Sequence, residues 1–216
     1  KTWLLIQEFC ANDTCFSGLK LAHNRGHQNA LLAGLMTAKE YADIVISMDA
    51  DLQDDIEAMA AKGVVSGVTE TTFEPDRNIT RAEFATLICK ALGITAVNSG
   101  SFADVMVGEW YFPYVNAAAS AGLIVGYDGY FRPDDLITRQ EMAVILAKAY
   151  AFWGYAPKVG GIDKFSDKES IADWAYSSVD TAATAGLIFG LTQDTFGPYE
   201  YTTRAQAVSV LKRLLD

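Results

Sequence analysis

The sequence predicts a mainly α-helical protein built from three helix-loop-helix repeats, with a small α/β segment in front of them. Three observations support this prediction. The same landmark residues recur three times between residue 57 and the C-terminus. Each copy contains a capping pattern followed by an apolar stripe at helical spacing. The residues before the first copy contain one helical stretch and one short apolar strand.

The repeat is identified by matched glycine, phenylalanine, proline and arginine positions. The arginines are 58 and 65 residues apart, and extra residues at 154–161 account for much of the longer spacing. The matched positions are Gly63, Gly122 and Gly186; Gly67, Gly126 and Gly190; Phe73, Phe131 and Phe196; Pro75, Pro133 and Pro198; Arg81, Arg139 and Arg204.

Each repeat is expected to contain two helices. In the second repeat, Tyr114 to Ala121 is alanine-rich, and Gly122 is expected to end this helix as a C′ glycine. A second helix is predicted from about Arg139 to Tyr150. Its core-facing stripe is formed by Met142, Ile145, Leu146 and Ala149.

The start of each second helix predicts an anion-binding site. Thr80-Arg-Ala-Glu83, Thr138-Arg-Gln-Glu141 and Thr203-Arg-Ala-Gln206 fit the capping box, which explains the threonine and the glutamate or glutamine. It does not explain an arginine at the positive end of the helix dipole. Free amides and a guanidinium together favour an anion. Alternatively, each arginine pairs with a nearby carboxylate such as Asp76 or Asp134.

The aromatic residues fall into two groups. Phe73, Phe131 and Phe196 each precede a proline by two residues and are predicted to fill the core. Trp110 and Trp174 stand at the start of first helices. An exposed indole there suits stacking on a sugar ring, and burial is an equally good interpretation.

Composition excludes several classes of function. The net charge of −10 argues against nucleic acid or an anionic membrane as a bulk partner. The sequence contains no apolar run long enough to span a bilayer, and no leader peptide is visible. Cys10, Cys15 and Cys89 show no metal-binding spacing and are expected to be buried free thiols.

The landmarks resemble the S-layer homology (SLH) domain. The resemblance covers about residues 57–216 and includes Phe102-Ala-Asp104-Val105, Phe165-Ser-Asp167, Trp110, Trp174-Ala175, and the segments ITRAEF, ITRQEM and TTRAQA. It implies a pseudo-threefold bundle whose inter-repeat grooves bind anionic, often pyruvylated, secondary cell-wall polysaccharide at the cell surface. It also implies that Arg81, Arg139 and Arg204 meet the carboxylate of the sugar ketal and that the tryptophans line grooves.

The chain departs from the family pattern in two repeats. Repeat three has Gln206 in place of glutamate, and Tyr199 where the other repeats have Asp76 and Asp134. Repeat one lacks a recognisable opening of the F-x-D-V type. The predicted segments are 1–56, 57–98, 99–156 and 162–216, with the first helix of repeat one borrowed from about residue 51. Leu52, Ile56, Met59 and Ala60 are expected on one side of that helix.

Residues 18–56 resemble a different family. The runs LAHNRGHQNALLAGL and VISMDADLQDD are similar to polyprenyl-phosphate glycosyltransferases of the dolichol-phosphate mannose synthase type. In such an enzyme Asp49 and Asp51 would hold a divalent metal against a sugar diphosphate. The resemblance covers only a fragment, too short for a nucleotide-sugar fold.

Two functions therefore compete. The first is a monomeric, non-catalytic anchor that binds wall polysaccharide and needs no cofactor. Its binding residues are Arg81, Arg139, Arg204, Trp110, Trp174, Asp76 and Asp134. The second is a metal-dependent glycosyltransferase that uses Asp49 and Asp51, expected to be inactive because it is truncated. A structural fusion without either activity is a third possibility.

Overall fold

The computed structural model describes residues 50–69 and 72–216. The chain divides into two compact units, 1–50 and 51–216, and all described residues except Ala50 belong to the second unit. The unit is mainly helical, and its described residues contain isolated β-bridges but no extended strand. Its helices are α3 (Ala50–Ala61), α4 (Arg81–Ala91), α5 (Phe112–Ser120), α6 (Arg139–Phe152), the 3-10 helix η1 (Lys168–Ser170), α7 (Asp173–Thr184) and α8 (Arg204–Leu215). Residues 1–49, which include the predicted helix and strand of the α/β segment, lie outside the described residues.

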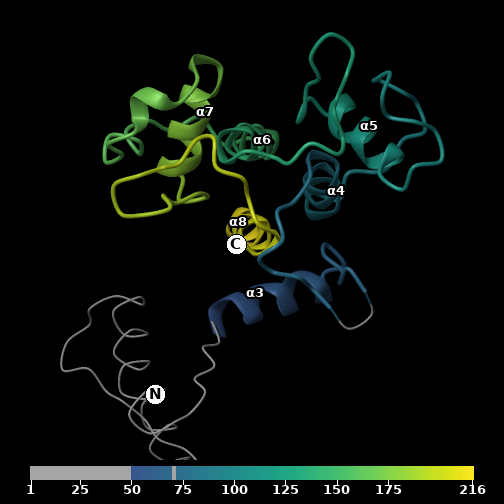
Figure 1. The fold of residues 1–216 in the computed structure, drawn as a ribbon, viewed down its shortest axis with the longest axis horizontal. Coiled ribbons are helices and arrows are strands. Elements are labelled where there is room, and N and C mark those ends of the chain that lie inside the picture. The colour runs from purple at the N-terminus through teal and green to yellow at the C-terminus, as the bar shows by residue number, and fades with distance from the viewer. Residues whose placement is uncertain (1–49, 70–71) are drawn as a thin grey trace, which may run out of the picture. The chain divides into compact units, whose positions relative to one another are not determined.

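The helices form three successive pairs, each with a first helix, a loop and a second helix. The pairs are α3–α4, α5–α6 and α7–α8. Figure 1 shows α4, α6 and α8 nearly end-on, with α5 next to α4 and α7 next to α6. Gly63, Gly122 and Gly186 each follow a first helix with φ of 70°, 73° and 75°. This left-handed backbone favours glycine and confirms the predicted helix ends.

All three second helices begin with the predicted capping box. In α4 the Thr80 hydroxyl accepts a hydrogen bond from the Glu83 amide at 3.2 Å, and the Glu83 carboxylate accepts one from the Thr80 amide at 2.9 Å. Two of the amides that the first turn leaves unpaired are thereby satisfied.

Equivalent backbone contacts connect the repeats in a closed cycle. The amide of each capping-box arginine donates to a loop carbonyl of the next repeat, and repeat three returns to repeat one. The three bonds are Arg81 N to Asp135 O, Arg139 N to Glu200 O and Arg204 N to Arg77 O, each 2.9 Å long. Because equivalent atoms form all three bonds, each repeat pairs with the start of its neighbour's second helix or with its neighbour's loop in the same way.

The core contains one apolar stripe from each second helix. Met142, Ile145, Leu146 and Ala149 are all buried, as predicted. Phe131 and Phe196 are buried, while Phe73 is only partly buried and packs against the same core. On α3, Met59 is fully buried and Ile56 partly buried, but Ala60 is exposed, so the predicted face of this helix is only partly right. No helix in the described part of the chain is both long and apolar enough to cross a membrane.

Asp104 and Asp167 hold the loop of their own repeat in place. The Asp104 carboxylate accepts hydrogen bonds from the amides of Phe131 and Arg132 at 2.8 and 2.6 Å, and Arg132 has a φ of 57°. Asp167 accepts equivalent bonds from Phe196 and Gly197. Each aspartate therefore fixes a left-handed residue directly after a core phenylalanine.

We expect Asp104→Ala to lower the free energy of unfolding by about 2–3 kcal/mol, because the buried Phe131 amide loses its partner. Urea denaturation followed by circular dichroism measures the effect. Asp163→Ala is the control, since Asp163 is an exposed residue that pairs with the partly exposed Lys168, and it should cost less than about 0.5 kcal/mol. Equal losses in the two variants would contradict the assigned role of Asp104.

Cys89 is a buried free thiol, as predicted, whereas Cys10 and Cys15 lie outside the described residues. Burial raises the pKa of its thiol from 9.0 to about 12. The unfolded chain loses this proton near pH 9 and the folded chain only near pH 12. The stability that the protonated thiol contributes is therefore complete below pH 9 and is lost as the pH rises through 12.

Cys89 should therefore resist iodoacetamide in the native protein at pH 8 and react fully in urea, because the thiolate is the nucleophile. Peptide mapping by mass spectrometry separates Cys89 from the other two cysteines. Rapid alkylation of native Cys89 at pH 8 would show that the thiol is accessible.

Candidate functional site

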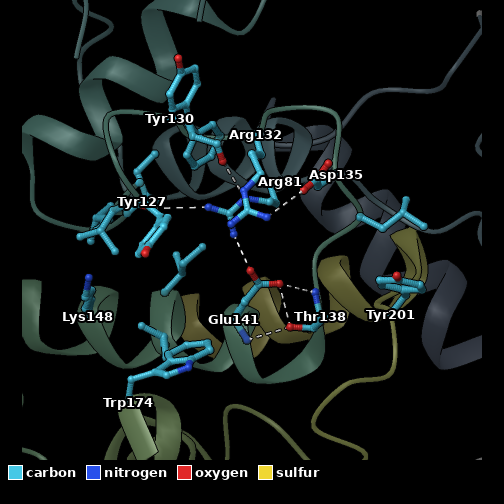
Figure 2. Close-up of a pocket in the computed structure, with 18 residues that line it drawn as sticks. Arg81, Tyr127, Tyr130, Arg132, Asp135, Thr138, Glu141, Lys148, Trp174 and Tyr201 are labelled. Carbon is cyan, nitrogen blue, oxygen red and sulfur yellow. Dashed lines mark hydrogen bonds and ion pairs between the residues drawn. The ribbon is translucent and has the colours of Figure 1, made fainter. Parts of the chain in front are cut away.

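A large cavity lies where the three repeats meet, and we call it the Arg81 cavity (Figure 2). Its volume is about 750 Å³, within the range of cavities that hold small ligands. Repeat one contributes Arg81, and repeat three contributes Trp174 and Tyr201. Repeat two contributes its loop from Leu123 to Tyr127 and one face of α6, which includes Glu141 and Lys148.

Arg81 joins repeat one to repeat two. Its Nη1 forms an ion pair with Glu141 at 2.6 Å, and its Nε donates to the Phe131 carbonyl at 2.9 Å. The guanidinium also lies over the Phe131 ring, 4.8 Å from the centroid. Figure 2 shows the arginine pointing across the cavity to Glu141, which also caps α6 through Thr138. Most of the guanidinium fork is therefore occupied by protein groups.

Lys148 provides a cationic group that is not paired in this way. Its Nζ has no ion pair or hydrogen bond among residues 55–69 and 72–216, and burial lowers its pKa. Figure 2 shows Lys148 and Trp174 at the same end of the cavity, opposite Tyr201. Trp174 is 61% exposed and Tyr127 77% exposed. The cavity thus combines an unpaired ammonium with exposed aromatic faces.

A second cavity, the Arg204 cavity, repeats this arrangement at the junction of repeat three with repeat one. Its volume is about 410 Å³. Repeat three contributes Arg204, repeat one its loop and α4 with Lys90, and repeat two Trp110. Arg204 Nε donates to the Phe73 carbonyl at 2.9 Å, matching the bond from Arg81 to Phe131. Lys90 and Trp110 therefore occupy the positions of Lys148 and Trp174.

Among the described residues, Glu83 in the Arg204 cavity contacts two arginines, whereas Glu141 in the Arg81 cavity contacts one. Arg77 donates to both of its carboxylate oxygens, and Arg204 lies 3.8 Å away. Burial acts to raise the pKa of Glu83, but the hydrogen bonds from Arg77 and the Thr80 amide outweigh it and lower the pKa overall. Glu83 therefore remains ionised and neutralises part of the positive charge.

Arg139 occupies the third equivalent position and is the most deeply buried of the three arginines, with 3% of its surface exposed. Its Nε donates to the Phe196 carbonyl at 2.8 Å and its Nη2 to the Phe189 carbonyl. It has no carboxylate ion pair in the described part of the chain, because Gln206 stands where the other repeats have glutamate. Burial lowers the pKa of Arg139 to about 10.

The third position differs in a further way. Trp110 and Trp174 each stand twelve residues before the glycine that ends their helix. In repeat one the residue twelve positions before Gly63 is Asp51. The equivalent of Lys90 and Lys148 is Arg213, whose guanidinium lies 4.5 Å from the centroid of Phe189. The third junction therefore lacks both the tryptophan and the glutamate of the other two.

The predicted residues do not all meet at one place. Arg81 and Trp174 share one cavity, and Arg204 and Trp110 share the other. Asp76 and Asp134 are exposed and line neither cavity. Arg81 and Arg204 do pair with carboxylates, but these are Glu141 and Glu83 of the following repeat rather than Asp76 or Asp134. Asp49 and the side chain of Asp51 lie outside the described residues.

Sequence reasoning missed the basic residue in each second helix. Lys90, Lys148 and Arg213 each stand nine residues after the capping-box arginine. This recurrence was visible in the sequence, but a lysine on an amphipathic helix is ordinarily a solvated residue. The cavities show that Lys90 and Lys148 face the same spaces as the tryptophans.

Comparison with known families places the chain in one of them. The model of the S-layer homology domain matches residues 41–85, 101–143 and 164–208, so the chain belongs to this family. It is 37% identical to the exoglucanase XynX of Acetivibrio thermocellus over 93% of this chain and 19% of that protein. It is 40% identical to an amylopullulanase of Thermoanaerobacterium thermosulfurigenes over 76% of this chain and 9% of that protein. It is 32% identical to an S-layer protein of Bacillus thuringiensis subsp. finitimus over 85% of this chain and 24% of that protein.

These relationships define a cell-surface anchoring module, located at the cell surface or cell wall. The chain spans a quarter or less of the length of these three relatives. Some relatives are named as enzymes and others as S-layer proteins. This chain matches both kinds of protein, and the family it matches is the S-layer homology domain. The module therefore points to attachment rather than catalysis.

The comparisons give no support to the transferase resemblance of residues 18–56. The first family match begins at residue 41, inside that segment. Residues 57–216 make up about three quarters of the chain, so the alignment with the exoglucanase over 93% of it includes part of the preceding segment. Residues 18–49 lie outside the described residues.

Proposed function

We propose that the repeats form a pseudo-threefold bundle that binds anionic, pyruvylated secondary cell-wall polysaccharide in the Arg81 and Arg204 cavities. The observation that carries this proposal is the Arg81 cavity, where the exposed Trp174 lies together with Lys148, which has no partner among the residues that the structure describes. The closed cycle of equivalent backbone bonds supports the threefold arrangement.

The charges of the cavities favour an anion even though the chain is strongly acidic. Arg81, Arg132 and Lys148 line the first cavity against two carboxylates, those of Asp135 and Glu141. Three cations, Arg77, Lys90 and Arg204, line the second against Glu83 alone. A partly buried ammonium without a partner is unfavourable, and a ligand carboxylate would compensate it. The capping-box arginines would then position the cavity walls, while the lysines contact the ligand.

The aromatic residues favour a sugar as the carrier of that negative charge. Trp110 and Trp174 are 57% and 61% exposed at helix starts that face the cavities. A flat apolar face beside hydrogen-bonding groups suits a pyranose ring, which has apolar faces and polar edges. Each cavity is lined by three repeats of the same chain, so a single copy suffices, and we propose that the module acts as a monomer.

Co-sedimentation with purified cell walls tests the proposal. The chain should bind untreated walls and lose binding after hydrofluoric acid has removed the secondary polysaccharide. Mild acid that removes the pyruvate ketal from the released polysaccharide should abolish its ability to compete. Equal binding to extracted walls would contradict polysaccharide binding, and unchanged competition after ketal removal would contradict recognition of the carboxylate.

A further inference from the structure

A smaller cavity lies beside the Arg81 cavity, and we call it the linker cavity. Its volume is about 270 Å³, and its lining includes Lys148, Tyr150, Tyr155, Ser177, Ser178 and Thr181. It is smaller than the roughly 300–1,000 Å³ of cavities that hold drug-sized ligands, which suits a single sugar residue. Its walls provide two tyrosine rings, three aliphatic hydroxyl groups and one ammonium, which are groups that bind sugars.

Residues inserted between repeats two and three build one wall of this cavity. Tyr155 and Pro157 belong to the linker that makes the spacing between repeats two and three longer. The Tyr155 ring stacks on Tyr150 with centroids 4.6 Å apart and 21° between the planes. Tyr155 remains 53% exposed, so its ring is available to a ligand.

The linker is attached firmly to α7. The Asp180 carboxylate accepts hydrogen bonds from the amides of Gly160 and Gly161, both at 2.8 Å. A Cβ at Gly161 would lie 2.4 Å from the Thr184 amide nitrogen, so only glycine allows this approach. The Thr181 hydroxyl donates to the Lys158 carbonyl at 3.1 Å. These contacts hold the linker wall of the cavity against the helix.

The two cavities are neighbours along α6 and α7, which pack against each other. Lys148 lines both cavities. On α7, Trp174 lines the first cavity, and Ser177, Ser178 and Thr181 line the second. These residues are three, four and seven positions apart and therefore lie on one face of the helix. A chain of sugars leaving the Arg81 cavity past Lys148 would follow this face.

We infer that the linker cavity is a subsite for the next sugar residue of the polysaccharide held in the Arg81 cavity, with Tyr155 as the stacking platform. Lys148 lies between the two sites, where it can contact the residues on either side of one glycosidic bond. This inference rests on the proposed function and adds to it a preference for fragments longer than one residue.

Calorimetric titration with size-fractionated wall polysaccharide tests the subsite. The unmodified chain should bind fragments of several residues more tightly than a single pyruvylated residue. Tyr155→Ala should weaken binding of the longer fragments about fivefold and leave the single residue unchanged. Ser177→Trp, at an exposed position, should obstruct the linker cavity, and it should likewise weaken binding of the longer fragments and leave binding of the single residue unchanged. Tyr176→Ala is the control, because Tyr176 is an exposed tyrosine of α7 that lines neither cavity.

Two results would overturn the subsite while leaving the proposed function intact. One is equal affinity of the unmodified chain for short and long fragments. The other is a Tyr155→Ala or Ser177→Trp variant that binds long fragments like the control. If the unmodified chain binds neither fragment class, the proposed function itself fails.

Discussion

Arg139→Ala is expected to lower the free energy of unfolding by about 3–4 kcal/mol. The substitution removes a buried side chain and leaves the carbonyls of Phe189 and Phe196 without a donor. It also removes the guanidinium that lies 5.0 Å from the centroid of Phe196. Repeats two and three lose a contact that links them, and urea denaturation followed by circular dichroism measures the loss.

Arg132→Ala is the matched control for this prediction. Arg132 has the same side chain, but 60% of it is exposed and its only ion pair within the described residues is a 3.7 Å contact with Asp135. It should change the free energy of unfolding by less than about 0.5 kcal/mol. If Arg139→Ala costs less than about 1 kcal/mol, its contacts with the two carbonyls do not hold the repeats together.

Trp174→Ala and Lys148→Ala are each expected to weaken wall binding by about tenfold or more. Trp174 would lose its stacking face and Lys148 its charge-assisted hydrogen bond, and losses of about 1.5–3 kcal/mol correspond to this change in affinity. Both side chains are partly or largely exposed, so the fold should persist. Co-sedimentation with cell walls over a range of protein concentrations gives the affinities.

Trp153→Ala and Lys168→Ala are the matched controls for the binding variants. Trp153 caps the end of α6 and Lys168 pairs with Asp163, and neither residue lines the Arg81 cavity. Both variants should bind walls as the unmodified chain does. Should Trp174→Ala match Trp153→Ala in affinity, the Arg81 cavity would not be the binding site.

Local patterns in the sequence were sufficient to predict the helices. Thr138 and Glu141 specify the start of α6, and Gly122 specifies the end of α5, because capping depends on residues within one turn. The position of each arginine was also predicted. The partner of each arginine was not predicted. Arg81 pairs with Glu141, sixty residues further along the chain, and only the packing of repeat one against repeat two brings the two side chains together.

Two other features of the sequence were interpreted incompletely. Lys148 was not among the predicted binding residues because nothing in α6 itself shows which lysine faces a cavity formed with other repeats. The F-x-D-V pattern finds no opening in repeat one, yet the family match begins at residue 41. Tyr41-Ala-Asp43-Ile44 stands there, and conservative exchanges distinguish it from Phe102-Ala-Asp104-Val105.

The central claim is that an anionic sugar binds where Lys148 and Trp174 line the Arg81 cavity. A crystal structure of the chain soaked with a pyruvylated amino sugar tests it most directly. The account predicts density for the sugar in this cavity, with its carboxylate within hydrogen-bonding distance of Lys148 Nζ and its ring against Trp174. A bound sugar located away from both residues would contradict the account.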